Sequence, residues 1–259
     1  MRAVSLVFLM ILSTSLYACE TPIRMLYGPY VTLLMVQKLL TPMHNRVEKA
    51  SGCEVEYTLA SSFEDLANKL VELEHDFALV PASYSAITLE MGYERFVSIS
   101  EENRYIYIVA HAQSNIHSLN DLTGKELLSI SPLSESGASF EQLLREKQLR
   151  SRVKVVNGNN YEQNIFKVLS GQSDSAIAIS IYWDQLDDYM KSKKLKVVSK
   201  LKSRPAEFVK RFGRDHIAQP VRNVLLTETA LTWELPDHEL QYNQELKEAI
   251  SAYINSGMN

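Results

Sequence analysis

The sequence lacks the patterns that identify most enzymes and nucleic-acid-binding proteins. It has only two cysteines, and its six histidines show neither HxxxH nor HExxH spacing, so a zinc site has no support. It contains no GxSxG motif, no P-loop and no glycine-rich dinucleotide turn. The net charge is −4 and no dense Lys/Arg block exists, which argues against nucleic acid as a partner. We therefore expect no catalytic residue, no metal and no cofactor.

The sequence also lacks an apolar run long enough to cross a bilayer. The uncharged residues 3–18, which follow Arg2, fall short of the ~20 apolar residues that a span requires and are typical of a secretion signal. Residues 16–19, Leu-Tyr-Ala-Cys, resemble a bacterial lipobox. Residues 1–19 are thus interpreted as a signal with lipidation at Cys19, which predicts a protein of the periplasm or cell envelope held at a membrane by a lipid anchor. The alternative is a freely secreted chain in which Cys19 pairs with Cys53.

Strand-like and helix-like runs alternate along the rest of the chain, with no internal repeat and no low-complexity linker. This alternation is typical of parallel βαβ units, in which ligands bind beyond the carboxyl ends of the strands. The expected strands are residues 23–27, 55–59, 76–80, 104–111, 126–130, 153–156, 175–180 and 195–200.

Two crossings between lobes are expected from this order. Residues 20–108 begin the first lobe, 109–200 form the second, and 201–259 return to the first. The return is predicted as a strand at 221–231, followed by a closing helix at 236–253. The sequence therefore predicts an α/β protein of two hinged lobes with a ligand cleft between them.

One segment carries the strongest indication of a ligand. Residues 131–140, Ser-Pro-Leu-Ser-Glu-Ser-Gly-Ala-Ser-Phe, lie where a strand ends and a helix begins. Ser134 or Ser136 can cap that helix, and the free N–H groups of its first turn, together with the Ser134, Ser136 and Ser139 hydroxyls, can hold an oxyanion. The alternative is an ordinary helix cap without a ligand.

Five segments together resemble the periplasmic substrate-binding proteins of phosphate, phosphite and phosphonate ABC transporters, a family with the type II periplasmic-binding fold. Individually the segments are short, but their order and spacing span most of residues 23–180. They are Tyr-Gly-Pro-Tyr at 27–30, Ala-Ser-Ser-Phe-Glu-Asp at 60–65, Asp-Phe-Ala-Leu-Val-Pro at 76–81, Leu-Asn-Asp-Leu-Thr-Gly-Lys at 119–125 and Ser-Glu-Ser-Gly at 134–137.

The resemblance implies a ligand site in the cleft, without catalysis. Hydroxyls and amides would donate to a small oxyanion or small organic anion, and tyrosine rings would pack on its body. Tyr161 stands where the family commonly has a histidine, and Glu135 would repel an anion unless its side chain turned to solvent. The candidate ligand-binding residues are Tyr27, Pro81, Ala82, Ser83, Tyr84, Ser134, Glu135, Ser136, Gly137, Tyr161 and Ser180.

The resemblance further implies a monomeric, exported solute-binding lipoprotein that captures a phosphate-like or phosphonate-like ligand for an ABC permease. Because of the departures at Glu135 and Tyr161, a non-transport alternative stays open, in which the same fold serves a membrane sensor or another partner. An enzyme that enlists Tyr27 or Cys53 is a third hypothesis, and no base can be paired with either residue from the sequence.

Overall fold

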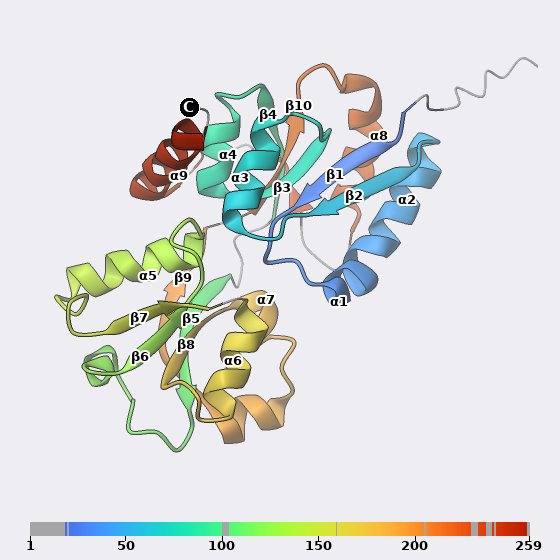
Figure 1. Cartoon of the computed structure of the whole chain (residues 1–259). Coiled ribbons are helices and arrows are strands. Elements are labelled where there is room, and N and C mark those ends of the chain that lie inside the picture. The colour runs from blue at the N-terminus through green and yellow to red at the C-terminus, as the bar shows by residue number, and fades with distance from the viewer. Residues whose placement is uncertain are drawn as a thin grey trace, which may run out of the picture.

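The computed structural model describes residues 19, 21–99, 104–158, 160–204, 206–228, 233–236, 240 and 242–257. Two β-sheets, each flanked by helices, form two lobes (Figure 1). This is the two-lobed α/β architecture that the sequence predicts. The candidate signal at 1–18 lies outside the described residues. Within the described ranges, no helix is both long and apolar enough to cross a membrane.

The first sheet has six strands in the order β11-β4-β10-β3-β1-β2. β1 pairs in parallel with both β2 and β3, whereas β10 runs antiparallel to β3 and β4. The carboxyl ends of β1, β2 and β3 therefore meet at one edge, which faces the second lobe. The strands are β1 (Ile23–Tyr27), β2 (Val55–Leu59), β3 (Phe77–Pro81), β4 (Tyr93–Ile99), β10 (Ala206–Arg211) and β11 (Trp233–Glu234).

Helices on the first lobe begin and end where the sequence offers caps. The side chain of Ser62 accepts a hydrogen bond from the Asp65 amide at the start of α3, and α2 ends at Gly52, which has a φ of 72°. A π-helical turn, Val36–Leu40, joins α1 to α2. The helices are α1 (Leu33–Met35), α2 (Thr41–Ser51), α3 (Phe63–Val71), α4 (Ala82–Thr88), α8 (Asp215–Leu226) and α9 (Gln244–Gly257).

The second sheet has five strands in the order β7-β6-β8-β5-β9. Its strands are β5 (Tyr105–His111), β6 (Glu126–Ser129), β7 (Lys154–Asn157), β8 (Ser175–Ile179) and β9 (Leu195–Lys202). Its helical segments are the 3-10 turn Leu119–Leu122, α5 (Glu135–Glu146), α6 (Tyr161–Leu169), α7 (Ser180–Trp183) and the π turn Met190–Lys194.

The chain passes between the sheets twice, after Ile99 and after Lys202. All of β5 pairs within the second sheet, between β8 and β9. The boundaries expected after residues 108 and 200 fall inside β5 and β9. The two crossings therefore fall between Ile99 and Tyr105 and between Lys202 and Ala206. Their described residues Arg104, Ser203 and Arg204 line the cleft described below.

The predicted return strand at 221–231 is wrong. Its residues 221–226 belong to helix α8, because Ile217, Val221, Val224 and Leu225 recur at helical spacing and form one buried face. The return strand is β10, which the sequence analysis missed together with β4. The closing helix begins at Gln244, later than the expected residue 236.

A buried carboxylate on β10 lies inside the first lobe. Glu207 has no exposed surface, and its oxygens accept hydrogen bonds from the hydroxyls of Ser85 (2.6 Å) and Ser98 (2.8 Å) and pair with Arg95. All four residues belong to α4 and to neighbouring strands of the first sheet. This cluster ties helix α4 to the sheet beneath it.

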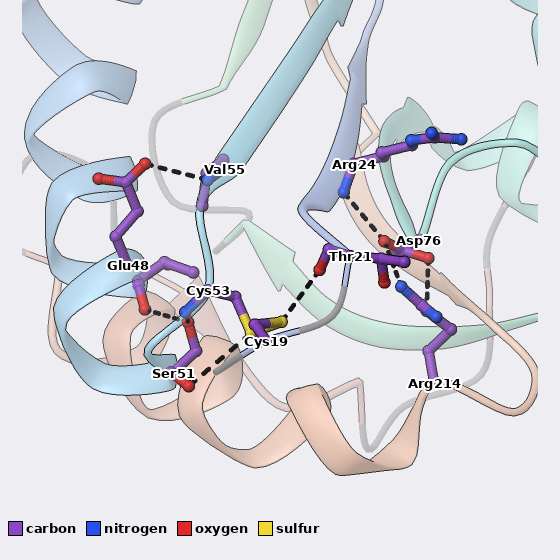
Figure 2. Close-up of a disulfide and its surroundings, with 10 residues drawn as sticks. Cys19, Thr21, Arg24, Glu48, Ser51, Cys53, Val55, Asp76 and Arg214 are labelled. Atoms are coloured by element: carbon purple, nitrogen blue, oxygen red, sulfur yellow. Dashed lines mark hydrogen bonds and ion pairs between the residues drawn. A yellow bond between two sulfur atoms is a disulfide. The ribbon is translucent and has the colours of Figure 1, made fainter. Parts of the chain in front are cut away.

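A disulfide joins Cys19 to Cys53 at the amino end of the first sheet, with a Cα–Cα distance of 4.9 Å (Figure 2). It fastens the segment before β1 to the turn between α2 and β2. The Sγ atom of Cys19, which a thioether-linked lipid would also need, is bonded to Cys53 here, so the lipidation expected at Cys19 is not shown and stays a prediction. The observed pairing is the alternative that the sequence left open. It also removes Cys53 as a free nucleophile.

Candidate ligand-binding site

A cavity of about 90 Å³ lies between the lobes. This is smaller than the ~150 Å³ cavity that accepts a benzene-sized guest, so the closed cleft suits only a small molecule. Its wall is mainly apolar and comes from both lobes. The first lobe contributes Met35, Leu40, Phe63 and Leu79, and the second contributes Ile106, Ile179 and Ile181.

The amino end of α5 reaches this cavity, as the sequence predicts, but its serines are already engaged within the chain. Ser134 caps the helix by accepting from the Gly137 amide at 2.9 Å. The Ser136 hydroxyl lies 2.7 Å from that of Tyr161. Burial raises the pKa of Tyr161 to about 12, so this phenol stays protonated near neutral pH. Because the Ser134 and Ser136 hydroxyls also lie 3.4 Å apart, these three hydroxyls form one chain of contacts at the cavity wall.

Glu135 does not turn to solvent, as an anion-binding role for this helix end would require. Its side chain enters the cleft, where Ser83 of the first lobe donates to Oε2 at 2.7 Å and Arg204 donates to Oε1 at 2.5 Å. The residue is only 8% exposed. Ser83 in turn accepts from the Asn243 amide at 3.1 Å. The Glu135 carboxylate thus takes the donors that would otherwise be available to an anionic ligand.

Arg104 also lines the cavity, at the first crossing between the lobes. Burial lowers the pKa of its guanidinium, and the nearby Tyr30 raises it. Over the described residues, its side chain makes no hydrogen bond and no ion pair. A half-buried cation without an anionic partner is energetically costly, and an anion in the cavity would relieve that cost. The sequence did not predict Arg104 as a site residue, and its only signal was a single positive charge at the start of a strongly apolar strand.

Tyr30 is a second cavity-lining residue that was not among the ligand-binding residues predicted from the sequence. Its hydroxyl donates to the Leu79 carbonyl at 2.7 Å, and the Tyr182 hydroxyl of the second lobe donates to the Tyr30 carbonyl at 2.7 Å. A further link joins Ser131 to Glu64 across the lobes at 2.8 Å. Together with the bond between Ser83 and Glu135, these contacts hold the cleft closed.

Tyr27 lies elsewhere, which corrects its expected ligand role. It has no exposed surface, and its hydroxyl is 2.7 Å from Nε2 of His44 on α2. Its side chain lies in the core of the first lobe, whereas Tyr30, three positions later, lines the cavity. Burial lowers the pKa of His44 to about 4 and therefore keeps it neutral.

The other candidates divide into cavity residues and supporting residues. Pro81 lines the cavity, whereas Ala82 and Tyr84 are buried in α4, where the Tyr84 hydroxyl donates to the Phe63 carbonyl. Ser180 begins α7 and accepts from the Tyr105 amide at 3.3 Å. A Cβ on Gly137 would lie 2.7 Å from the Ser131 carbonyl, so this helix turn requires glycine. No cluster of potential metal ligands occurs in the described part of the chain.

A family model described as ABC transporter, phosphonate, periplasmic substrate-binding protein matches residues 29–250. The chain belongs to this family. Its members are periplasmic binding proteins and not enzymes, which confirms the resemblance and the expected absence of catalysis. A search of curated protein sequences finds no match.

Solved structures confirm the fold. A binding protein component of an ABC phosphonate transporter from Pseudomonas aeruginosa is 15% identical with a TM-score of 0.71, over 92% of this chain and 96% of that one. PhnD1 from Prochlorococcus marinus, solved with methylphosphonate, is 12% identical with a TM-score of 0.67, over 91% and 90%. The periplasmic VFT2 domain of BvgS from Bordetella pertussis is 18% identical with a TM-score of 0.52, over 89% and 92%.

Proposed function

We propose that this chain is the exported substrate-binding protein of an ABC transporter and that it captures a small oxyanion or organic anion in the cleft. Family membership supports the transport role. The observation that carries the ligand class is Arg104, a guanidinium on the cavity wall without an anionic partner among the described residues. The methylphosphonate held by the similar Prochlorococcus protein has the same chemistry.

In this proposal the anionic head of the ligand pairs with Arg104 while its body packs against the apolar wall. Closure of the lobes excludes water, which strengthens the ion pair because the effective dielectric constant falls. Phe63 of the first lobe and Ile179 of the second then contact the same molecule. The ligand thereby adds contacts that exist only in the closed form. Binding therefore shifts the equilibrium between open and closed molecules toward the closed form.

A melting experiment tests this function. The purified protein is heated with phosphate, phosphite, methylphosphonate, methanesulfonate and short carboxylates in turn. A ligand at a hundredfold excess over its Kd contributes ~2.7 kcal/mol, which should raise the melting temperature by about 5–10 °C. Arg104→Gln should lose that shift, whereas Arg152→Gln, a change at an exposed turn, should keep it. No shift with any of these anions would contradict the proposal.

A membrane sensor in place of a permease is the alternative partner. The likeness to the BvgS domain concerns the fold alone and does not favour it. Genes for a permease and an ATPase beside the gene for this chain would support transport, and a kinase or cyclase gene would support sensing. We further propose that the mature protein works in the periplasm without a lipid on Cys19, because that sulfur pairs with Cys53.

A further inference from the structure

We infer that Glu135 sets the charge of the ligand, so that the cleft selects a singly charged anion with an apolar body over doubly charged phosphate-like anions. This inference rests on the proposed function and adds a specificity to it. The sequence predicts an anion site at the amino end of α5. In the structure the carboxylate of Glu135 occupies this site and takes hydrogen bonds from Ser83 and Arg204.

The charged side chains on the cavity wall determine which ligand charge the cleft can neutralise. Among the described lining residues, Arg104 and Arg204 are the cations and Glu135 is the anion, so one net positive charge remains. Arg204 is committed to Glu135 at 2.5 Å, which leaves Arg104 for the ligand. The next carboxylate, Glu64, faces a neighbouring hollow and accepts from Ser131. A single negative charge on the ligand therefore neutralises the cavity.

Among the described lining residues, a second negative charge on the ligand would find no second free cation. The Ser83 hydroxyl donates to Glu135, Ser136 and Tyr161 share a hydrogen bond, and Ser134 accepts from the Gly137 amide, so these neutral groups supply no positive charge. A doubly charged head would thus meet a buried carboxylate in a wall that is otherwise mainly apolar. Burial of an unpaired charge in such surroundings is strongly unfavourable. Without Glu135, both guanidinium groups would be free for a dianion.

The size and polarity of the wall define the rest of the ligand. Leu40, Phe63, Ile106 and Ile179 offer no hydrogen-bonding side chain to a ligand's body. The closed cavity of about 90 Å³ admits only a few non-hydrogen atoms. The best-matched chemistry is a small alkyl group on a singly charged sulfonate, carboxylate or phosphonate head.

Methanesulfonate and methylphosphonate form a matched pair of probes, because both are small tetrahedral anions with one methyl group. At about pH 9, well above the second ionisation of a phosphate-like head, they carry one and two charges respectively. Tyr161 stays protonated there, since burial raises its pKa to about 12. Calorimetric titration of each probe at constant ionic strength thus isolates the charge of the ligand.

We expect the natural chain to bind methanesulfonate at least tenfold more tightly than methylphosphonate. In Glu135→Gln, which keeps the shape and loses the charge, the ratio should move at least tenfold toward methylphosphonate. Glu141→Gln makes the same change on the same helix outside the cavity and should leave the ratio unchanged. Glu135→Ser serves as a second variant, with folding checked by circular dichroism.

The outcomes separate the two proposals. Equal affinities, or tighter binding of methylphosphonate to the natural chain, would overturn the role of Glu135 while leaving capture of small anions intact. An unchanged ratio in both Glu135 variants would overturn it as well. If neither probe bound any of these proteins and the wider panel of anions also failed, the proposed function would fall together with this inference.

Discussion

Two buried carboxylates in this protein have similar partners and different consequences. Glu207 lies in the core of the first lobe, and its partners Ser85, Ser98 and Arg95 all belong to that lobe. Glu135 also takes a serine and an arginine, but Ser83 reaches it from the other lobe. A carboxylate bound within one rigid body stabilises the fold, whereas one bound across a cleft competes with the ligand. The difference lies in the position of the partners and not in the chemistry of the bonds.

The largest expected effect is the loss of Glu207. Glu207→Ala leaves Arg95 and two hydroxyls without their buried acceptor, which should lower the free energy of unfolding by ~3–5 kcal/mol. Glu135→Ala should cost much less, because the cleft can open and hydrate its partners. Urea unfolding of the two variants in parallel measures both values. Equal losses of unfolding free energy in the two variants would contradict this difference between Glu207 and Glu135.

The second largest expected effect is the loss of the disulfide between Cys19 and Cys53. Cys53→Ser opens a link between residues 34 apart in sequence and should lower the free energy of unfolding by ~2–4 kcal/mol. Because this link lies at the end of the sheet away from the cleft, ligand affinity should not change. A double variant that also carries Cys19→Ser should match the single one. Detection of a lipid on Cys19 by mass spectrometry of the periplasmic protein would contradict the pairing.

A smaller effect is expected from His44, the buried partner of Tyr27. Its folded-state pKa of about 4 lies below the 6.5 of an exposed histidine, so the unfolded chain binds more protons between these values. The contribution of His44 is therefore complete above pH 6.5 and is lost as the pH falls toward 4. The loss should be on the order of 2 kcal/mol or less, because the group is partly screened. His44→Gln should flatten this part of the curve of stability against pH.

The smallest effect has the opposite sign. Arg104→Met removes a half-buried cation that has no anionic partner in the described chain, and it should raise the stability of the ligand-free protein by ~1 kcal/mol. The same change should abolish stabilisation by the ligand. Melting curves with and without methanesulfonate measure both. A destabilised ligand-free variant would mean that Arg104 serves the fold rather than the site.

The sequence predicts most of the fold because its strands are apolar and its helices are capped. β1, β2 and β5 lie within a residue or two of their expected positions, since Ser, Asn or Gly residues mark their ends. β10 was missed because charged residues flank its apolar pair Phe208 and Val209, and its pairing with β3 and β4 depends on strands more than 100 residues away. Local periodicity contains no information about such partners.

The site was predictable only in part, for a related reason. The α5 end and the residues after β3 reach the cleft as expected, because strand ends fix where they lie. Arg104 and Arg204 belong to the two crossings, where no periodic pattern exists. The orientation of Glu135 depends on Ser83 and Arg204, which are distant in sequence, and so its entry into the cleft follows only from the assembled lobes.

Helix α9 adds a further link between the two lobes, outside the cleft. It packs beside α4 on the first lobe, while Glu245 near its start pairs with Arg145 of α5 on the second (Figure 1). Such an exposed pair contributes only ~0–1 kcal/mol, so it can break each time the lobes part. The end of the chain should therefore report the motion of the cleft. A dye on α9 and another on α5 would make that motion visible as a change in energy transfer.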